Sequence, residues 1–377
     1  EDLRQLEADG LLRRRRTAES PQGVQLVVDG REFLSFCSND YLGLANHPAL
    51  VAALQQGAAQ FGAGAGASHL VSGHTGAHHN LETQLAEFVG LPRALLFSTG
   101  YMANLGIVTA LVGRDDEIFA DKLNHASLND AALLSRAKLT RYPHCDLAAL
   151  AQRLAASRAR RKLVAVDAVF SMDGDIAPVP ELLALCERFD AWLLLDDAHG
   201  FGVLGAEGRG VLEHFALRSP RILYMATLGK AAGVAGAFAA GEAALVEMLI
   251  QRARTYIYTT AMPPPLAVAL SASLHLIAEE RWRRARLTEL IAVLRQRLQP
   301  RRWRLLASAT AIQPLIIGGN AETLAVSEAL RERGIWVPAI RPPTVPKGQA
   351  RLRISLSAAH RVADVEQLAA ALNEIEA

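Results

Sequence analysis

Lysine is scarce in this sequence of 377 residues. Only five of its 40 basic residues are lysines, and all the others are arginines. An arginine side chain stays protonated in proteins and forms no imine, whereas a lysine amine can lose its proton. Chemistry that needs a free amine therefore has five candidates: Lys122, Lys138, Lys162, Lys230 and Lys347.

Cysteine is also rare. The three cysteines, Cys37, Cys145 and Cys186, are odd in number and show no C-x-x-C spacing. This pattern argues against a disulfide framework and against a zinc site of the C-x-x-C type. We therefore expect a cytoplasmic protein in a reducing compartment, and no bound metal.

Neither a large net charge nor a long apolar run is present. The net charge is only +2, which gives no broad electrostatic surface for nucleic acid or for an anionic membrane. No apolar run approaches the roughly 18–20 residues that span a bilayer, and the polar, arginine-rich N-terminal segment is not typical of a signal sequence. These absences favour a small-molecule partner.

Short apolar runs alternate with helical patterns through the middle of the chain. This alternation predicts an α/β fold with a mostly parallel central sheet and helices on both faces. Ligands of such sheets bind beyond the carboxyl ends of the strands. The runs with the clearest strand character are residues 94–99, 117–121, 162–168, 192–197 and 221–227.

Three parts of the chain are expected. Residues 1–40 form an N-terminal arm, with a helix ending near Arg16 and two strands around the turn Asp29-Gly30. Residues 41–262 form the large α/β domain, which would hold a cofactor. The prolines from Pro263 to Pro265 break the pattern, and residues 263–377 form a small α+β domain.

Lys230 is the best candidate for an imine-forming lysine. It follows the strand at 221–227 in Thr227-Leu228-Gly229-Lys230, so that the strand end would direct the amine to the ligand-binding edge of the sheet. Its neighbours are apolar. Lys138, Lys162 and Lys347 flank arginines or turns and are better explained as solvated surface charges.

Asp196 ends another strand, and His199 follows it by three residues. A carboxylate at this edge can keep a pyridine nitrogen protonated, because ion pairing raises the pKa of that nitrogen. A protonated pyridine ring attached to Lys230 would act as an electron sink. A metal cluster or a helix cap is the alternative explanation for this motif.

Five further residues could contact such a cofactor. Gly100 and Tyr101 begin a helix after a strand, where free N–H groups make a phosphate site, and Thr227 could add a hydroxyl. His125 could stack on a flat ring, and Ser171 could donate to a ring oxygen. Each signal alone is better explained by a plain helix cap or another structural role.

Two arginine segments could bind a carboxylate. Arg351 and Arg353 would share one face of a strand, and the guanidinium of Arg353 could clamp an amino-acid carboxylate. The alternative is an exposed strand face. The run Arg13–Arg16 is by default a solvated helix face, from which one member could turn toward a substrate.

Several longer stretches resemble the α-oxoamine synthases, a family of fold-type I pyridoxal-5′-phosphate (PLP) enzymes, and the resemblance runs nearly end to end. The resemblance implies PLP as cofactor and decarboxylative condensation of an amino acid with an acyl thioester. The matching stretches are SNDYLGL (38–44), FSTGYMAN (97–104), DAVFSMDGD (167–175), DDAHGFGVLG (196–205), TLGK (227–230) and YTTAMPP (258–264).

The resemblance assigns a role to each candidate. Lys230 would be the Schiff-base lysine, and Asp196 would be the partner of the pyridine nitrogen. The other cofactor contacts would be His125 stacked on the ring, Ser171 and His199 at the ring oxygen, and Thr227 with Gly100 and Tyr101 at the phosphate. Substrate would contact His125, Asn39, Arg353, Arg13 and Thr344.

Two of these assignments are limited by the sequence itself. A one-residue shift in the run Arg13–Arg16 would move the substrate contact from Arg13 to Arg14. Asp167 stands where many relatives carry glutamate, which leaves its supporting role open.

Family members are homodimers, and residues 72–75 resemble the loop that reaches the neighbouring cofactor.

Two stretches resemble the family members that join L-alanine to a pimeloyl thioester in biotin biosynthesis. They are AIRPPTVP (339–346) and TLGKAAGVAG (227–236), the second of which lacks an added glycine pair. Whether the acyl carrier is coenzyme A or an acyl-carrier protein stays open. The alternatives are a sibling that joins glycine to acetyl- or succinyl-coenzyme A, an aminotransferase, and an inactive homologue that only binds ligands.

Overall fold

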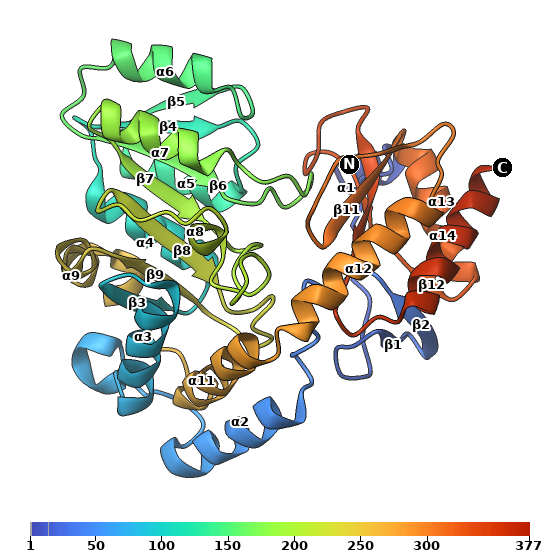
Figure 1. Cartoon of the computed structure of the whole chain (residues 1–377), viewed down its shortest axis with the longest axis horizontal. Helices are drawn as coiled ribbons and strands as arrows, with labels where there is room; N and C mark the ends of the chain where they lie inside the picture. The colour runs from blue at the N-terminus through green and yellow to red at the C-terminus, as the bar shows by residue number, and fades with distance from the viewer. Residues whose placement is uncertain (1, 14) are drawn as a thin grey trace. The chain divides into compact units, whose positions relative to one another are not determined.

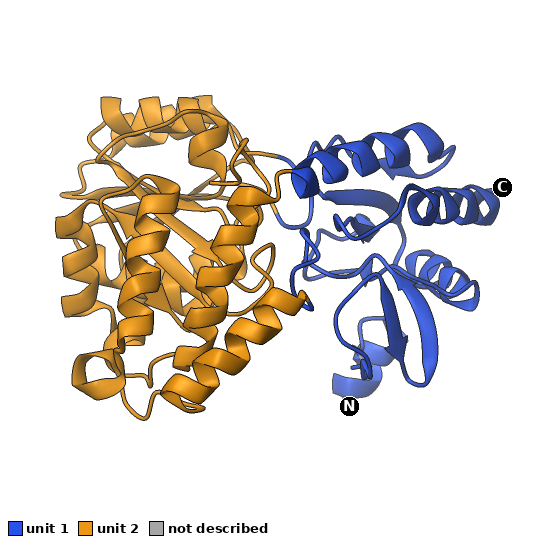
Figure 2. Ribbon diagram, turned by 60° about the horizontal axis from the view of Figure 1, so that its bottom comes forward, with its two compact units in different colours: residues 1–46, 171–175, 282–377 blue, residues 47–170, 176–281 orange. Residues whose placement is uncertain are grey.

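The computed structural model describes residues 2–13 and 15–377. They form two compact units, which Figure 2 distinguishes by colour. Unit 1 comprises residues 1–46, 171–175 and 282–377, and unit 2 comprises residues 47–170 and 176–281. None of the helices in the described part of the chain is both long enough and apolar enough to cross a membrane.

A seven-stranded sheet forms the centre of unit 2, in the order β3-β9-β8-β7-β6-β4-β5. All neighbouring pairs are parallel except those made by β9, which is antiparallel to both β3 and β8. The predicted mostly parallel sheet is therefore confirmed. The strands are β3 (Arg93–Phe97), β4 (Glu117–Asp121), β5 (Lys138–Tyr142), β6 (Lys162–Asp167), β7 (Trp192–Asp196), β8 (Ile222–Thr227) and β9 (Ala237–Gly241).

Helices cover both faces of this sheet, as Figure 1 shows. Side chains from α4, α5, α9 and α10 pack with the strands into one buried apolar cluster. On the other face, α3 packs on β3 and α7 packs on β7. The helices of unit 2 are α2 (Pro48–Phe61), α3 (Gly76–Val89), α4 (Gly100–Leu111), α5 (Ala126–Ser135), α6 (Leu147–Ala156), α7 (Val179–Arg188), α8 (Val211–His214), α9 (Ala243–Arg252), α10 (Arg254–Ile257) and α11 (Pro264–Glu279), with a π-helical turn η1 at His69–Gly73.

Unit 1 combines the N-terminal arm with the C-terminal segment. Strands β1 and β2 form the predicted hairpin, and β2 pairs with β12. A second sheet has the order β10-β11-β14-β13. The elements are α1 (Asp2–Ala8), β1 (Gln25–Val28), β2 (Arg31–Ser35), α12 (Trp282–Arg297), β10 (Arg304–Leu305), β11 (Ile312–Gly318), α13 (Asn320–Glu332), β12 (Ile335–Trp336), β13 (Ala339–Ile340), β14 (Ala350–Ser355) and α14 (Val362–Glu376).

The first helix is shorter than its sequence predicts. It ends at Ala8, and the prediction that it continues to about Arg16 is wrong. Gly10 adopts a left-handed backbone with φ +64°, and its N–H donates to the carbonyl of Glu7. A glycine in this conformation ends a helix at little steric cost, so Arg13, Arg15 and Arg16 lie outside the helix.

The compact units and the predicted domain boundaries fall at different residues. Helix α11 begins within the proline break, at Pro264, but packs on α2 and α3, so it belongs to unit 2. Residues 171–175 belong to unit 1, because the carbonyl of Gly174 accepts hydrogen bonds from the hydroxyls of Ser308 and Thr310. The division into an arm, a large domain and a small domain stays a prediction about which segments fold together.

Candidate functional site

Seven of the candidate residues lie in unit 2. They are Gly100, Tyr101, His125, Asp196, His199, Thr227 and Lys230. They come from the carboxyl ends of β7 and β8, from the loop after β4, and from the first residues of α4. Parallel strands end at the same edge of a sheet, so this arrangement follows directly from the topology.

Lys230 and His199 are in direct contact. The Nζ atom of Lys230 lies 2.9 Å from Nε2 of His199. The loop that carries Lys230 is a closed turn, because Gly233 N–H donates to the Lys230 carbonyl and Val234 N–H donates to the Leu228 carbonyl. The turn is made of small residues, and Gly233 and Gly236 have positive φ angles that favour glycine.

Asp196 is buried at the end of β7 and is held by two donors. Its Oδ2 accepts from Nδ2 of Asn104 at 2.7 Å, and its Oδ1 accepts from the backbone N–H of Ala198 at 3.1 Å. These bonds fix the carboxylate plane. The sequence did not single out Asn104, although it lies in the stretch 97–104 that resembles the family.

A chain of hydrogen bonds continues from Asp196 to His125. Asn104 also donates to the hydroxyl of Ser127 at 2.9 Å, and that hydroxyl lies 2.7 Å from Nδ1 of His125. Ser127 is the second residue that sequence reasoning missed. The imidazole of His125 is therefore oriented by α5, while the residue as a whole stays exposed, so that a flat ring could approach it.

Asp167 supports His125 through the backbone. The N–H of His125 donates to the two carboxyl oxygens of Asp167 at 3.1 and 3.3 Å. Burial, and then the nearby carboxylate of Asp196, raise the pKa of Asp167 well above its usual range. The shorter side chain of aspartate thus still reaches the loop after β4, and it holds a proton more tightly than an ordinary carboxyl group.

The start of α4 fits a phosphate group. Thr99 caps the helix, and a Cβ atom added to Gly100 would lie 2.5 Å from the Cγ2 methyl of Thr227. The Oγ1 hydroxyl of Thr227 is buried and has no hydrogen-bond partner in the described part of the chain. An unsatisfied hydroxyl beside free helix N–H groups suits the phosphate of PLP, and Asp196 suits its pyridine nitrogen.

Arg353 lies in unit 1, on β14, in a set of neutral oxygen atoms. Its guanidinium donates to the Ser171 carbonyl at 2.6 Å and to Oδ1 of Asn39 at 3.0 Å. Within the described residues it makes no ion pair, whereas Arg351 pairs with Asp173 at 2.8 Å. Both arginines are buried, so the alternative of an exposed strand face is wrong.

A second pair of arginines, Arg13 and Arg341, lies elsewhere in unit 1. Nη2 of Arg13 donates to Oγ1 of Thr344 at 3.3 Å. Both residues line a cavity of about 230 Å³, together with Arg341 and with apolar side chains of Leu11 and Ile340. No acidic side chain from the described residues lines this cavity. Arg14 lies outside the described residues.

Arg341 was not singled out by the sequence. One of its guanidinium nitrogens donates to the carbonyl of Gly10, but its Nε is buried without a partner in the described structure. Burial, and then the positive charge of Arg13, lower the pKa of Arg341. Two guanidiniums that repel each other beside a hydroxyl form a site suited to a carboxylate.

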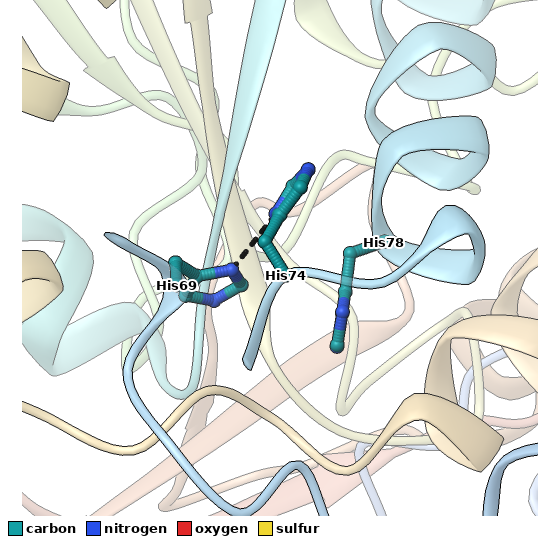
Figure 3. Close-up of side chains that lie close together, drawn as sticks. All are labelled: His69, His74 and His78. Atoms are coloured by element: carbon teal, nitrogen blue, oxygen red, sulfur yellow. Dashed lines mark hydrogen bonds between the residues drawn. The ribbon is translucent and has the colours of Figure 1, made fainter. Parts of the chain in front are cut away.

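Residues 72–75 belong to a cluster of histidines in unit 2. Nδ1 of His69 lies 3.0 Å from Nδ1 of His74, and Figure 3 shows these two rings with His78 beside them. His69 also stacks on Tyr256. Burial first, and then the neighbouring imidazoles His78 and His74, lower the pKa of His69 to about 3.

The His69 pKa predicts a loss of stability in acid. The unfolded chain takes up a proton below about pH 6.5, whereas folded His69 stays neutral, so its stabilising effect is present above pH 6.5 and declines as the pH falls toward 3. We expect a loss of about 1–2 kcal/mol at pH 5. Urea unfolding at pH 7.5 and 5 would measure it, and His69→Phe, which keeps the stacking ring, should show a smaller loss. An equal loss in both proteins would contradict this assignment.

Comparison with known proteins places this geometry in a class. The family model for aminotransferase class I and II matches residues 31–372. Serine palmitoyltransferase from S. paucimobilis, solved with a PLP–myriocin aldimine bound, is 28% identical, with a TM-score of 0.93 over 99% of this chain and 95% of that chain. The chain is thus a PLP-dependent enzyme of fold type I.

Closer relatives narrow the class. The 8-amino-7-oxononanoate synthase of Nitrosospira multiformis is 68% identical over 97% of this chain and 92% of the relative. That of Nitrosomonas eutropha is 64% identical over 100% and 98%. The crystal structure of 8-amino-7-oxononanoate synthase from Francisella tularensis is 32% identical, with a TM-score of 0.78 over 91% of this chain and 97% of that chain. The chain belongs to the 8-amino-7-oxononanoate synthases, which are PLP-dependent acyltransferases within the aminotransferase class I and II family.

Proposed function

We propose that this enzyme condenses L-alanine with a pimeloyl thioester to give 8-amino-7-oxononanoate, carbon dioxide and the free thiol carrier. The product in the name of the relatives has a nine-carbon chain, and this number of carbons supports these substrates. Pimeloyl supplies the seven carbons that end in the ketone, and alanine supplies two more after its carboxylate leaves as carbon dioxide. Glycine would give a product one carbon shorter.

The residues of unit 2 would hold the cofactor and move one proton. Thr227 and the N–H groups of Gly100 and Tyr101 would hold the phosphate, His125 would stack on the ring, and His199 would contact the ring oxygen. Asp196 keeps the pyridine nitrogen protonated. When bound, PLP supplies an electron sink for the negative charge that develops on the alanine Cα.

Lys230 would attach the cofactor and then act as the base. Its amine, when free of the cofactor, would remove the Cα proton of alanine, and the contact with His199 would position this amine. The Cα then bonds to the thioester carbonyl, and the C–S bond breaks to release the thiol. Loss of carbon dioxide and return of a proton to Cα complete the reaction.

Arg353 would bind the alanine carboxylate. Its neutral oxygen partners hold the guanidinium in place without neutralising it, so that an incoming carboxylate meets an unpaired buried cation. Asn39, which accepts from the same guanidinium, would lie near the reacting centre.

The cavity of Arg13, Arg341 and Thr344 would receive the far carboxylate of the pimeloyl chain. This is the single observation that best supports a dicarboxylic acyl donor, because an acetyl group has no second carboxylate to place there. The apolar side chains of Leu11 and Ile340 suit the methylene chain.

Arg341→Gln tests this acyl contact. Loss of one charge-assisted hydrogen bond, worth about 1.5–3 kcal/mol, should raise the KM for pimeloyl-coenzyme A by roughly 10–100-fold. The KM for heptanoyl-coenzyme A, which has no far carboxylate, should not change. Arg333→Gln, at an exposed position of the same unit, is the matched control. Equal effects on both donors would refute the carboxylate contact.

The reaction itself is tested with purified, PLP-loaded enzyme and four mixtures: alanine or glycine, each with pimeloyl-coenzyme A or a pimeloyl-acyl-carrier protein. The proposal predicts carbon dioxide and a nine-carbon aminoketone with alanine. A product formed with glycine but not with alanine would identify a glycine-using sibling. Conversion of the cofactor to its amine form by alanine without an acyl donor would identify an aminotransferase. Binding without carbon dioxide would indicate an inactive homologue.

We also propose a homodimer, in which residues 72–75 approach the neighbouring cofactor. Leu70 and Val71, in the turn before this loop, are 52% and 80% exposed, and a second copy would cover these apolar side chains. The chain mass is 40.6 kDa, so light scattering should give twice this value. A monomer that is active when loaded with PLP would contradict the proposal.

A further inference from the structure

Three side chains of the kinds that bind transition metals meet beyond the ends of β4 and β5. Asp121 is the last residue of β4, and His144 and Cys145 follow β5. The two strands are parallel, and Asp121 pairs in register with Tyr142, the last residue of β5. The register therefore brings the three side chains to one point of the sheet edge in unit 2.

The spacing of the ligand atoms is close to that of a tetrahedral metal site. Nδ1 of His144 lies 3.1 Å from Oδ1 of Asp121, and Sγ of Cys145 lies 3.8 Å from the same nitrogen. Zinc bond lengths of about 2.0–2.3 Å imply N···O and N···S separations of about 3.3–3.6 Å around one ion. Small side-chain rotations reach these values.

The carboxylate is already fixed in place. Oδ1 of Asp121 accepts from the N–H of Leu123, and its Oδ2 accepts from the N–H of Cys145, each at 2.8 Å. The Asp121 side chain is 1% exposed and that of His144 is 29% exposed, so the group is buried on one side and accessible on the other. Backbone donors to a ligating carboxylate are the outer contacts that orient metal ligands.

We propose that Asp121, His144 and Cys145 bind one divalent cation, zinc or a similar transition metal, with water as the fourth ligand. The mixed oxygen, nitrogen and sulfur set suits zinc, and binding releases the thiol proton of Cys145. The ion compensates the buried charge of Asp121 and ties together the loops after β4 and β5. The site could not be predicted from the sequence, because its ligands come from two strand ends and not from a C-x-x-C motif.

The histidine cluster of Figure 3 is less suited to a metal. Nδ1 of His78 accepts from the N–H of Thr75, and its Nε2 lies 2.7 Å from the carbonyl of Met262. Both ring nitrogens are therefore engaged with protein atoms. His74→Gln removes one member of this cluster and so distinguishes the two locations.

Equilibrium dialysis of the PLP-loaded protein against zinc chloride, after treatment with a chelator, tests the proposal. We expect one zinc per chain in the wild type and in His74→Gln. Cys145→Ser, a small change at a partly exposed position, should weaken binding by at least about tenfold, the loss seen even when an outer contact is removed. His144→Gln should do the same, and Cys37→Ser is the matched cysteine control.

Cadmium chloride gives a second readout, because a cadmium–thiolate bond produces an ultraviolet charge-transfer band. The band should appear in the wild type and in Cys37→Ser, and it should be absent in Cys145→Ser with an unchanged circular dichroism spectrum. Tight zinc binding that survives Cys145→Ser, or that is lost only in His74→Gln, would overturn the proposal. So would the absence of zinc binding in the wild type.

Discussion

Lys230→Ala is expected to lower kcat by about 10⁴-fold or more. In the proposed mechanism the change removes both the covalent attachment of the cofactor and the amine that takes the Cα proton, and general base catalysis alone accounts for about 10²–10⁴-fold. PLP should still bind, since the phosphate contacts proposed at Gly100, Tyr101 and Thr227 do not depend on the lysine. Carbon dioxide release in single turnovers measures the effect.

Two matched experiments separate this chemical role from a structural one. Lys230→Arg keeps the positive charge but offers no neutral amine, so it should be as inactive as the alanine variant. Added methylamine should partly restore Lys230→Ala, because it supplies the missing amine. Residual turnover of Lys230→Ala within tenfold of the wild type would exclude Lys230 as the cofactor lysine.

Asp196→Asn is expected to lower kcat by roughly 10²–10⁴-fold. A buried charge that loses its ionic partner costs about 3–5 kcal/mol, and here the cost falls on the protonated pyridine nitrogen. Asn104 and Ala198 donate to different oxygens of Asp196, and the amide replaces one of these oxygens with an NH2 donor, so one of the two bonds is lost.

The readout that identifies this role is deuterium exchange at the Cα of alanine without an acyl donor. Exchange should slow as much as kcat does in Asp196→Asn, whereas PLP affinity should change much less. Asp115→Asn, at an exposed position, serves as the control. Unchanged exchange would assign Asp196 to a structural role only.

The sequence predicted the parallel part of the sheet because β4, β6, β7 and β8 are buried on both faces and are therefore apolar except at the ends of the strands. It gave less indication of two strands. The residues of β9 are mainly alanine and glycine, which have weak strand propensity, and β5 lies at the sheet edge and carries charged side chains.

The residues of the candidate site also fall into those that could be predicted from the sequence and those that could not. Lys230, Asp196 and His199 follow strand ends, and this position can be read from the pattern of the chain. Asn104, Ser127 and Arg341 could not be predicted from the pattern, because their roles depend on contacts between segments far apart in the sequence. The short first helix depended on the backbone conformation of one glycine, Gly10.

The most direct test of the account is reduction of the PLP-loaded protein with borohydride, followed by digestion and mass spectrometry of the peptides. Reduction makes the bond between the cofactor and its lysine permanent. The account predicts the phosphopyridoxyl group on the peptide that contains Lys230 and on none of the other four lysines. Labelling of Lys122, Lys138, Lys162 or Lys347 instead, or no labelled peptide, would contradict it.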